Sequence, residues 1–297
     1  RSFLQVKAMT IATIDIGGTG IKFASLTPDG KILDKASTAT PETLEELLAW
    51  LDQRLSERDY RGIAMSVPGA VHQETGVIEG ISAIPYIHGF SWYEALAHHK
   101  LPIHLENDAN CVGLSELLAH PEIENAACVV IGTGIGGAMI INGKLHRGRH
   151  GLGGEFGYMT TIEPAERLNN WSQLASTGNM VRYVIEKSGQ TDWDGRKVYQ
   201  EAAAGNALCQ EAIERMNRNL AQGLLNIQYL IDPDVISLGG SISQNPDFIK
   251  GVQKAVDAFV ERYEEYTIAP VIQACTYQAD ANLYGALVNW LQEENQW

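Results

Sequence analysis

The sequence has few cysteines, few basic residues and no uninterrupted apolar run long enough to cross a membrane. Its four cysteines lie far apart and form no Cys-x-x-Cys pair. Neither a disulfide framework nor a cysteine zinc site is therefore expected, and a reducing cytoplasm fits best. Lysine and arginine number 22 against 36 aspartates and glutamates, which gives a formal net charge of -14. This balance argues against a broad basic surface for nucleic acid or anionic lipid.

The longest stretch without charge, residues 125–143, approaches the length of a membrane span. Glycines interrupt its middle, which favours two strands around a glycine turn, so no membrane attachment is expected. The opening residues 1–8 are too short and too weakly apolar for a signal peptide. Because Met9 looks like a natural start, we interpret these eight residues as a cloning remnant.

Strand and helix patterns alternate along the chain, and two regions echo each other. Each opens with apolar strands around a glycine-rich turn, at residues 15–20 and 132–137. We therefore expect an α/β protein with mixed sheets flanked by helices, arranged as two lobes with a ligand cleft at their boundary. The expected N-terminal lobe covers residues 9–118 and a last helix at about 282–297, and the C-terminal lobe covers residues 119–281.

Local patterns place the main elements. Thr40 and Pro41 are typical of a helix cap and first turn, and leucines at helical spacing follow them. The clearest helical pattern begins near Asn206 and ends before Pro233. An Asn-Gly pair at 142–143 indicates a hairpin. Strands are expected at residues 10–17, 21–26, 31–33, 62–66, 101–105, 127–131, 138–141, 235–238 and 271–275, and further helices at 246–260 and 282–291.

The first glycine-rich stretch reads DIGGTGIK and has the composition of a phosphate cradle. Its glycines would let backbone amides converge on an anion, and its threonine would add a hydroxyl donor. Its aspartate could hold hydrated Mg²⁺, because hard cations prefer oxygen ligands, and its lysine could add charge. A plain glycine hairpin explains the pattern equally well. The candidate phosphate-binding and Mg²⁺-binding residues are Asp15, Gly17, Gly18, Thr19, Gly20 and Lys22.

The second stretch, GTGIGG, matches the G-x-G-x-x-G pattern of dinucleotide sites. The apolar residues after it look like a strand, so the helix N-terminus needed for pyrophosphate binding is missing. A second phosphate-holding hairpin suits the pattern better, and a purely structural turn is the alternative. The candidate residues are Gly132, Thr133, Gly134 and Gly136.

Asn107 and Asp108 follow an apolar stretch and precede a helical pattern. For an isolated pair, capping of that helix is the simpler explanation. An aspartate at a strand end that faces a cleft is also where phosphoryl transfer needs a base, an effect worth about 10²- to 10⁴-fold. Asn107 would then orient the acceptor.

Residues 148–159 are dense in glycine around one carboxylate, Glu155. We expect a ligand or another backbone segment to approach closely there. Glu155 would accept hydrogen bonds from sugar hydroxyls, or it is a solvated loop carboxylate. Zinc ligation by His146 and His150 is not expected, because no cysteine supports them.

Gly239 and Gly240 follow a strand pattern and precede a helix capped near Asn245. They would let a nucleotide base or ribose lie against exposed backbone. The alternative is an ordinary loop between a strand and a helix.

In this order, the stretches DIGGTGIK, LENDAN, residues 131–158 and IDPDVISLGG resemble the ROK family of sugar kinases and repressors. The resemblance runs from about Met9 to the C-terminus. It implies the two-lobed, ribonuclease H-like fold of actin-like ATPases, ATP with Mg²⁺, phosphorylation of a sugar hydroxyl, and a homodimer. By the resemblance, both glycine hairpins bind ATP phosphates, Asp108 is the base, and Asn107 and Glu155 hold the sugar.

Two departures from the family pattern concern the substrate. ROK glucokinases usually have histidine where this chain has Tyr158, followed by a cysteine-rich zinc motif and a sugar-binding glutamate. Here residues 160–176 contain no cysteine and Ser172 takes the place of the glutamate, so no zinc site is expected. In the family these groups lie near the anomeric end of the sugar. We therefore expect a substrate substituted at the anomeric oxygen, such as cellobiose phosphorylated on its 6-hydroxyl, as in bacterial β-glucoside kinases.

Other functions stay open at this point. Within the enzyme class, these are a glucokinase and an N-acetylhexosamine or fructose kinase. A ROK repressor would carry a helix-turn-helix before the first glycine motif, but only eight residues precede Met9 and the charge is strongly negative. A sugar sensor without turnover is disfavoured by Asp108, because a pure binder needs no base.

Overall fold

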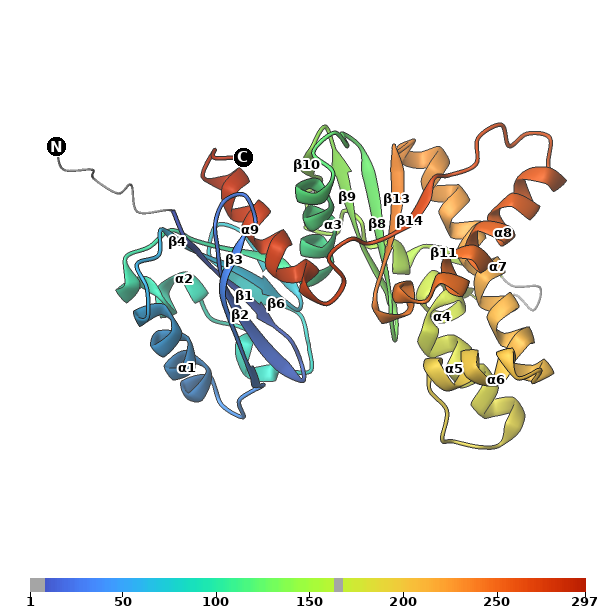
Figure 1. The fold of residues 1–297 in the computed structure, drawn as a ribbon, viewed down its shortest axis with the longest axis horizontal. Coiled ribbons are helices and arrows are strands. Elements are labelled where there is room, and N and C mark those ends of the chain that lie inside the picture. Colours follow the sequence, from blue (N-terminus) through green and yellow to red (C-terminus); the bar gives the residue numbers. More distant parts are fainter. Residues whose placement is uncertain (1–8, 163–167) are drawn as a thin grey trace. The chain divides into compact units, whose positions relative to one another are not determined.

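The structure is a computed structural model that describes residues 9–162 and 168–297. The interpretation of residues 1–8 as a cloning remnant lies outside the described residues. The chain divides into two compact units, which we describe separately (Figure 1). Unit 1 comprises Arg1–Pro121, Arg149–Gly151 and Ala279–Trp297, and unit 2 comprises Glu122–Gly148 and Leu152–Gln278.

Unit 1 is built on a five-stranded sheet in the order β3-β2-β1-β4-β7. The first three strands of the chain form an antiparallel meander, while β4 and β7 extend the sheet in parallel from β1. Every residue of β1 and β4 is buried, as expected for strands covered on both faces. The strands are β1 Ile11–Ile16, β2 Gly20–Leu26, β3 Ile32–Ala39, β4 Gly62–Val67 and β7 Ile103–Asn107.

Helices cover both faces of this sheet, and the two-residue period of the strands decides which side chains meet them. Ala12, Ile14 and Ile16 share one hydrophobic core with helix α1 (Leu44–Ser56). Ile11 and alternate residues of β2 belong to a second core with the C-terminal helix α9 (Ala281–Glu293). Asp15 therefore lies on the α9 side of the sheet. Smaller elements of this unit are β5 Ala70–His72, β6 Val77–Glu79, η1 Pro85–Ile87, α2 Trp92–Ala95, η2 Ala97–His99 and η5 Gln278–Asp280, which ends in it.

Helix α3 (Asp108–Ala119) follows β7 and packs against α9. The two backbones approach so closely that a Cβ atom on Gly285 would lie 1.7 Å from the carbonyl oxygen of Cys111. Only glycine fits at this crossing. The contact fixes the N-terminal turn of α3, and with it Asp108, on the Asp15 side of the sheet.

Unit 2 repeats the same sheet plan, in the order β10-β9-β8-β13-β14. Strands β8 and β9 form an antiparallel hairpin, and β13 and β14 continue from β8 in parallel. The strands are β8 Ala126–Ile131, β9 Ile135–Ile141, β10 Lys144–Leu145, β13 Val235–Gly239 and β14 Ile272–Ala274, with the small pair β11 Thr160–Ile162 and β12 Leu168–Asn170.

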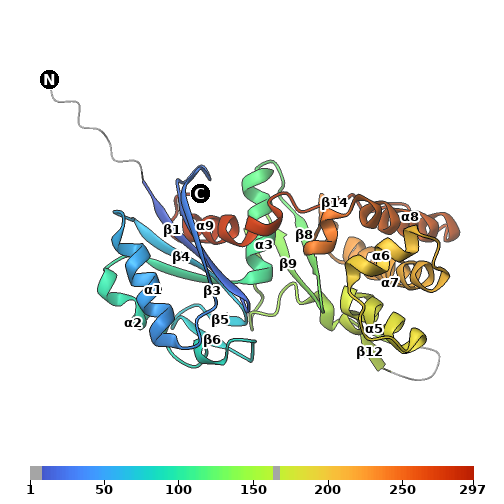
Figure 2. The same ribbon diagram turned by 60° about the horizontal axis from the view of Figure 1, so that its bottom comes forward.

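The longest helix, α7 (Ala207–Ile231), is the centre of the helical layer of unit 2 and packs against α5, α6 and α8 (Figure 2). Asn206 caps it by accepting hydrogen bonds from the amides of Leu208 and Cys209, which confirms the expected start. The remaining helices are α4 Trp171–Ala175, α5 Thr177–Ser188, α6 Gly195–Ala203, α8 Pro246–Arg262, η3 Phe156–Tyr158 and η4 Ser241–Gln244.

Some predicted boundaries were wrong. Helix α1 begins at Leu44, and its cap is Thr43, whose hydroxyl accepts from the amide of Glu46. Thr40 instead lies before the helix, directly after β3, and its side chain donates to the carbonyl oxygen of Gly17 in the first hairpin. β3 runs to Ala39, and β9 already begins at Ile135, since sheet partners extend both strands beyond their apolar runs.

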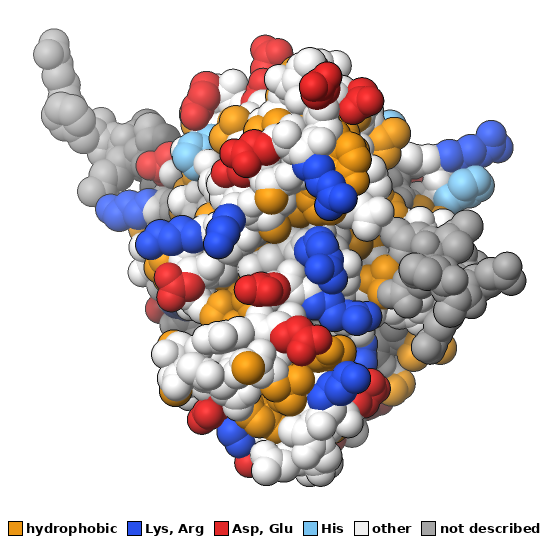
Figure 3. All heavy atoms as spheres, turned by 90° about the vertical axis from the view of Figure 1, so that its right-hand side faces the viewer, with side chains coloured by type: hydrophobic (Ala, Val, Ile, Leu, Met, Phe, Trp, Pro, Cys, Tyr) orange, Lys and Arg blue, Asp and Glu red, His pale blue; other side chains and the backbone are white. Residues whose placement is uncertain are grey.

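In the part of the chain that the structure describes, no helix is long and apolar enough to span a membrane. Figure 3 shows the surface of unit 2 that carries its helices. Lysine and arginine side chains form a column there, with acidic and apolar side chains on either side. Charges of both signs are therefore mixed on this face.

Candidate functional site

Asn107 and Asp108 lie where β7 ends and α3 begins. The side-chain oxygen of Asn107 accepts hydrogen bonds from the amides of Ala109 and Asn110, at 2.9 and 3.3 Å. Its amide nitrogen donates to the carbonyl oxygen of Gly69, at 3.0 Å. Capping by Asn107 is thus confirmed, and the cap fixes the start of the helix that presents Asp108.

The Asp108 carboxyl group has a raised pKa. The largest cause is burial; the negative charge of Asp15 raises the pKa further, while a hydrogen bond from the Ala109 amide lowers it. That hydrogen bond measures 2.8 Å. A carboxylate whose proton affinity is raised in this way is better suited to accept a proton than an ordinary surface aspartate.

Glu106, a buried residue that the sequence did not single out, supports this junction. Its carboxylate accepts from the backbone amide of Asn107 and from the side chain of Asn110, both at 2.8 Å. Its side chain is 2% exposed. Its only sequence signal is a charged residue at the end of an apolar stretch, so its role emerges from these contacts.

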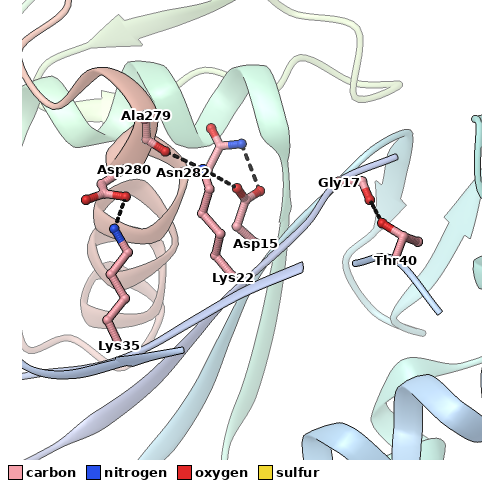
Figure 4. A network of polar contacts seen from close by, with 8 residues as sticks. All are labelled: Asp15, Gly17, Lys22, Lys35, Thr40, Ala279, Asp280 and Asn282. Carbon is pink, nitrogen blue, oxygen red and sulfur yellow. Dashed lines mark hydrogen bonds and ion pairs between the residues drawn. The ribbon is translucent and has the colours of Figure 1, made fainter. Parts of the chain in front are cut away.

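The first glycine hairpin joins β1 to β2, and Gly18 and Thr19 form its exposed tip. Gly17 closes the turn by donating to the carbonyl oxygen of Gly20, at 3.1 Å. Thr40 braces the tip: its hydroxyl donates to the Gly17 carbonyl at 2.6 Å (Figure 4). Its amide donates to the Thr19 carbonyl at 3.4 Å. Because both bonds from Thr40 end on carbonyl oxygens, neither consumes an amide of the hairpin.

Asp15 is held by Asn282 of the C-terminal segment and by Lys22 of β2, as Figure 4 shows. Its Oδ1 accepts from the side chain of Asn282 at 2.9 Å, and its Oδ2 lies 3.5 Å from the ammonium of Lys22. Lys22 also donates to the carbonyl oxygen of Ala279. The lysine that the sequence linked to phosphate therefore points at Asp15 and Ala279, and Asn282 is a site residue that the sequence did not reveal.

The second glycine hairpin joins β8 to β9 and exposes residues 132–134. Gly132 donates to the carbonyl oxygen of Gly134 at 2.9 Å and accepts from the amide of Gly178, in the first turn of α5, at 3.1 Å. Ser172 braces it from α4: its hydroxyl accepts from the Ile135 amide at 2.8 Å and lies 3.2 Å from the Ile135 carbonyl oxygen. Ser172 is thus engaged with hairpin backbone.

The glycine-dense loop after β10 lies close against β9. Gly154 has a φ of +88°, and a Cβ atom on it would lie 2.8 Å from the Cα of Ala138. A Cβ atom on Gly157 would lie 2.0 Å from the carbonyl oxygen of Ile135. The expected close approach of another backbone segment is confirmed. Glu155, half-buried, precedes η3 in this loop, and Tyr158 at its end is 71% exposed.

Unit 2 also contains a cavity of about 800 Å³ next to the first turn of α5. Its lining includes Thr177 and Tyr199, whose hydroxyl groups are buried and have no hydrogen-bond partner among the described residues. Burial, and then the charge of Asp247, raises the pKa of Tyr199. Buried polar groups of this kind are costly unless a ligand or water pairs with them. The cavity is lined by Thr177, Asp194, Gly195, Arg196, Tyr199, Gln200, Ala203, Ser241, Ile242, Gln244, Asn245 and Asp247.

Gly239 does not offer the exposed backbone that the sequence led us to expect, and Gly240 is only partly exposed. Gly239 is buried as the last residue of β13. Gly240 has a φ of +91°, and a Cβ atom on it would lie 2.1 Å from the carbonyl oxygen of Ile131. These glycines allow β13 to pack beside β8, and the lining of the cavity begins one residue later, at Ser241.

His88 adds a further polar group near Asn107. Its Nε2 lies 2.7 Å from the hydroxyl of Ser82, and its ring approaches Gly69, whose carbonyl accepts from Asn107. The Nδ1 atom of His88 is buried and has no hydrogen-bond partner within the described residues. No pattern in the sequence singled out this histidine, because it lies alone in a turn-rich stretch.

Comparisons with known proteins agree with this geometry. The model of the ROK family matches residues 11–293. A beta-glucoside kinase of Listeria monocytogenes is 35% identical over 97% of this chain and 99% of its own length, and one of Klebsiella pneumoniae is 31% identical over 96% and 97%. The crystal structure of a ROK family protein from Streptococcus pneumoniae TIGR4 in complex with sucrose is 88% identical, has a TM-score of 0.95, and is matched over 97% of this chain and 100% of that one. The expected fold class is thereby confirmed.

Proposed function

Because the chain belongs to the ROK family, we propose that it is an ATP-dependent sugar kinase. It transfers the γ-phosphoryl group to a sugar hydroxyl, with the 6-hydroxyl of a β-glucoside such as cellobiose as the acceptor. The observation that carries the proposal is the half-buried Asp108 carboxyl group, whose pKa is raised by burial and by the charge of Asp15, and whose helix start is fixed by Asn107. Phosphoryl transfer needs such a group to accept the hydroxyl proton.

Unit 2 has the features that the nucleoside of ATP requires. The cavity lining includes Thr177 and Tyr199, whose buried hydroxyl groups have no partner among the described residues and would gain one if these side chains turned toward a ribose or base. The cavity and the second glycine hairpin share the first turn of α5, since Gly178 donates to Gly132. A nucleoside in the cavity would therefore have its phosphates near this hairpin.

Unit 1 supplies the carboxylates. Asp15 and Asp108 interact electrostatically on the same side of the sheet, which suits hydrated Mg²⁺ better than an isolated acid would. Bound Mg²⁺ would offset charge on the phosphates. Asp15 is the residue we assign to it, through water, and Asp108 is left to accept the proton of the sugar hydroxyl.

The sugar is assigned to residues around Asp108 and to the loop that carries Glu155. The amide of Asn107 is fixed by the helix cap and by Gly69, so it would orient the acceptor without rearrangement. The unpaired Nδ1 of His88 offers a partner for a sugar hydroxyl. Glu155 would accept hydrogen bonds from other hydroxyls.

Two observations favour a substrate with a substituted anomeric oxygen. The hydroxyl of Ser172 is engaged with the backbone of Ile135, so it is poorly placed to select a free anomeric hydroxyl. In addition, relatives over nearly the whole chain are named beta-glucoside kinases, and the 88% identical protein was crystallised with sucrose, in which the anomeric oxygen of glucose is substituted. A site without partners for that hydroxyl does not penalise an ether there.

The test is a comparison of kcat/KM for cellobiose, methyl β-glucoside, methyl α-glucoside, sucrose and glucose, with ATP and Mg²⁺. We expect cellobiose and methyl β-glucoside to exceed glucose. A strong preference for glucose would overturn the substrate assignment while leaving the kinase assignment intact. Efficient use of sucrose alone would assign the site to α-linked substituents.

A pair of variants separates the role of Ser172 in binding from its role in bracing the hairpin. Ser172→Glu introduces the residue type that ROK glucokinases carry here, and we expect it to shift the ratio of kcat/KM toward glucose. Ser172→Ala removes the same hydrogen bonds to Ile135 without adding a carboxylate. If both variants shift the ratio equally, the position does not select the substrate.

A further inference from the structure

Three side chains of unit 1 converge away from Asp15 and Asp108. Asp52 lies on α1, and His98 and His99 lie on η2. Oδ1 of Asp52 is 2.9 Å from Nε2 of His98 and 2.7 Å from Nε2 of His99. The two imidazole rings are 4.1 Å apart between centroids. Helix α1 packs in the core with Ala12 and Ile14, on the sheet face opposite α9, so this cluster is separate from the candidate kinase residues.

The local sequence explains the convergence. Helix α1 buries Leu47, Leu51 and Leu55 in the core, which leaves Asp52 at the margin of its buried stripe. In η2, hydrogen bonds from His99 to Leu96 and from Lys100 to Ala97 form a tight turn that projects two successive histidines. Leu96, fully buried, anchors this turn next to α1.

We propose that Asp52, His98 and His99 bind a divalent transition-metal ion such as Zn²⁺, with water completing the coordination. Two imidazole nitrogens and one carboxylate oxygen are a ligand set for such ions, whereas Mg²⁺ prefers oxygen ligands alone. The site would therefore not compete for the Mg²⁺ that accompanies ATP.

The distances require only a small adjustment. The three donor atoms lie within 4.8 Å of one another. Bonds of about 2.0–2.2 Å at tetrahedral angles put ligand atoms roughly 3.3 Å apart, slightly more than the present 2.7 and 2.9 Å. The side chain of Asp52 is 44% exposed and that of His98 is 57% exposed, so both can shift by this amount, and ions and water can reach them.

An ordinary hydrogen-bonded cluster is the competing explanation. In it, one carboxylate oxygen accepts N–H groups from both histidines, so both must carry their proton on Nε2. A bound ion takes the place of the two protons on Nε2, and each imidazole then carries its proton on Nδ1. The ion holds the two Nε2 atoms and Oδ1 of Asp52 together. It would also link α1 to η2, and an ion that binds only the folded chain raises its melting temperature by mass action.

The test is calorimetry with Zn²⁺, and visible absorption with Co²⁺, on the full-length protein stripped of metal and free of nucleotide. We expect one equivalent to bind, a d–d spectrum typical of nitrogen and oxygen ligands, and a melting temperature raised by Zn²⁺. His98→Gln and His99→Gln should each weaken binding by roughly 10- to 100-fold or more. Kinase activity with Mg²⁺ should be unchanged in both variants.

A matched control is His104, which lies 2.8 Å from a single carboxylate, that of Glu294. His104→Gln removes a histidine from a two-residue pair and should leave the stoichiometry and affinity for Zn²⁺ unchanged. The proposal is overturned if the wild-type protein binds no Zn²⁺, or if the double variant His98→Gln, His99→Gln binds as the wild type does. Loss of kinase activity in Asp108→Asn has no bearing on this outcome.

Discussion

The two units of the molecule carry the same sheet with different chemistry at equivalent positions. In both, an antiparallel hairpin is followed by two parallel strands on one side. The last pairs before the turns are Ile16 with Ile21 and Ile131 with Ile135. One step earlier, unit 1 pairs Asp15 with Lys22, whereas unit 2 pairs Val130 with Gly136.

The difference extends to the ends of the outer parallel strands. In unit 1, β7 ends at Asn107 and leads directly into the helix that presents Asp108. In unit 2, β14 ends at Ala274 and leads into a loop. On our proposal, the repeated scaffold therefore places acid–base chemistry in unit 1 and the contacts to phosphate and nucleoside in unit 2, because function depends on the side chains at the strand ends.

The largest effect on kcat is expected at Asp108, for which unit 2 has no equivalent carboxylate at the end of its outer parallel strand. Asp108→Asn keeps the shape but removes the proton acceptor, so we expect kcat to fall by about 10²- to 10⁴-fold while the affinities for sugar and ATP are retained. Steady-state kinetics and calorimetry measure both quantities. Asp257→Asn, an exposed position on α8, is the matched control and should retain full activity.

The equivalent pair Asp15 and Val130 tests whether the charge itself matters. Asp15→Asn should raise the Mg²⁺ concentration needed for half-maximal activity by roughly 10- to 100-fold, because the carboxylate to which we assign the water bound to Mg²⁺ is lost. Val130→Thr changes the corresponding position of unit 2 and should leave the Mg²⁺ requirement unaltered. An equal change in the Mg²⁺ requirement of both variants would show that the carboxylate of unit 1 has no special role in binding Mg²⁺.

A pair of glycine substitutions separates packing from ligand contact within unit 2. Gly157→Ala would place a Cβ atom 2.0 Å from the Ile135 carbonyl oxygen, so we expect the free energy of unfolding to fall by about 1–3 kcal/mol. At Gly132, an added Cβ meets no atom of the described residues within 4 Å. Gly132→Ala should therefore leave the melting curve unchanged but raise the KM for ATP.

Tyr199→Phe tests the cavity of unit 2. The hydroxyl it removes is buried without a partner among the described residues, so the stability of the ligand-free protein should stay the same or rise. If that hydroxyl bonds to the nucleoside, the KM for ATP should increase roughly 2- to 10-fold, the equivalent of one ordinary hydrogen bond. An unchanged KM would place the nucleoside elsewhere.

The smallest expected effect is on stability against pH. Because the pKa of Asp108 is raised in the folded protein, the protonated group stabilises the fold below its unfolded pKa, and this contribution is lost as the pH rises through the folded pKa. Asp108→Asn does not ionise, so it should be more stable than the wild type at neutral pH and lose this advantage near pH 3. Denaturant titrations at several pH values measure the difference.

Local patterns predicted the parts that depend on neighbours in the sequence. The glycine turns between apolar strands, the Asn206 cap and the Asn107 cap all follow from residues within a few positions of one another. Contacts such as Thr40 with Gly17, or Ser172 with Ile135, join residues 23 and 37 positions apart. Such contacts form only when the sheet has folded, and no periodic pattern in the sequence predicts them.

The prediction of exposed backbone at Gly239 was wrong for the same reason. A glycine pair looks alike whether it exposes backbone to a ligand or admits a neighbouring strand, and only the distance from Gly240 to Ile131 decides. The unpaired hydroxyls of Thr177 and Tyr199 likewise become visible only when the surrounding helices are in place. Both cases concern tertiary packing.

The most direct measurement is a single turnover with enzyme in excess over γ-³²P-labelled ATP, in the presence of Mg²⁺ and cellobiose. We expect the label to appear on the disaccharide in amounts equal to the ADP formed. Asp108→Asn should make this product at least about 100-fold more slowly. Release of the label only as inorganic phosphate, or transfer at the wild-type rate by Asp108→Asn, would contradict this expectation.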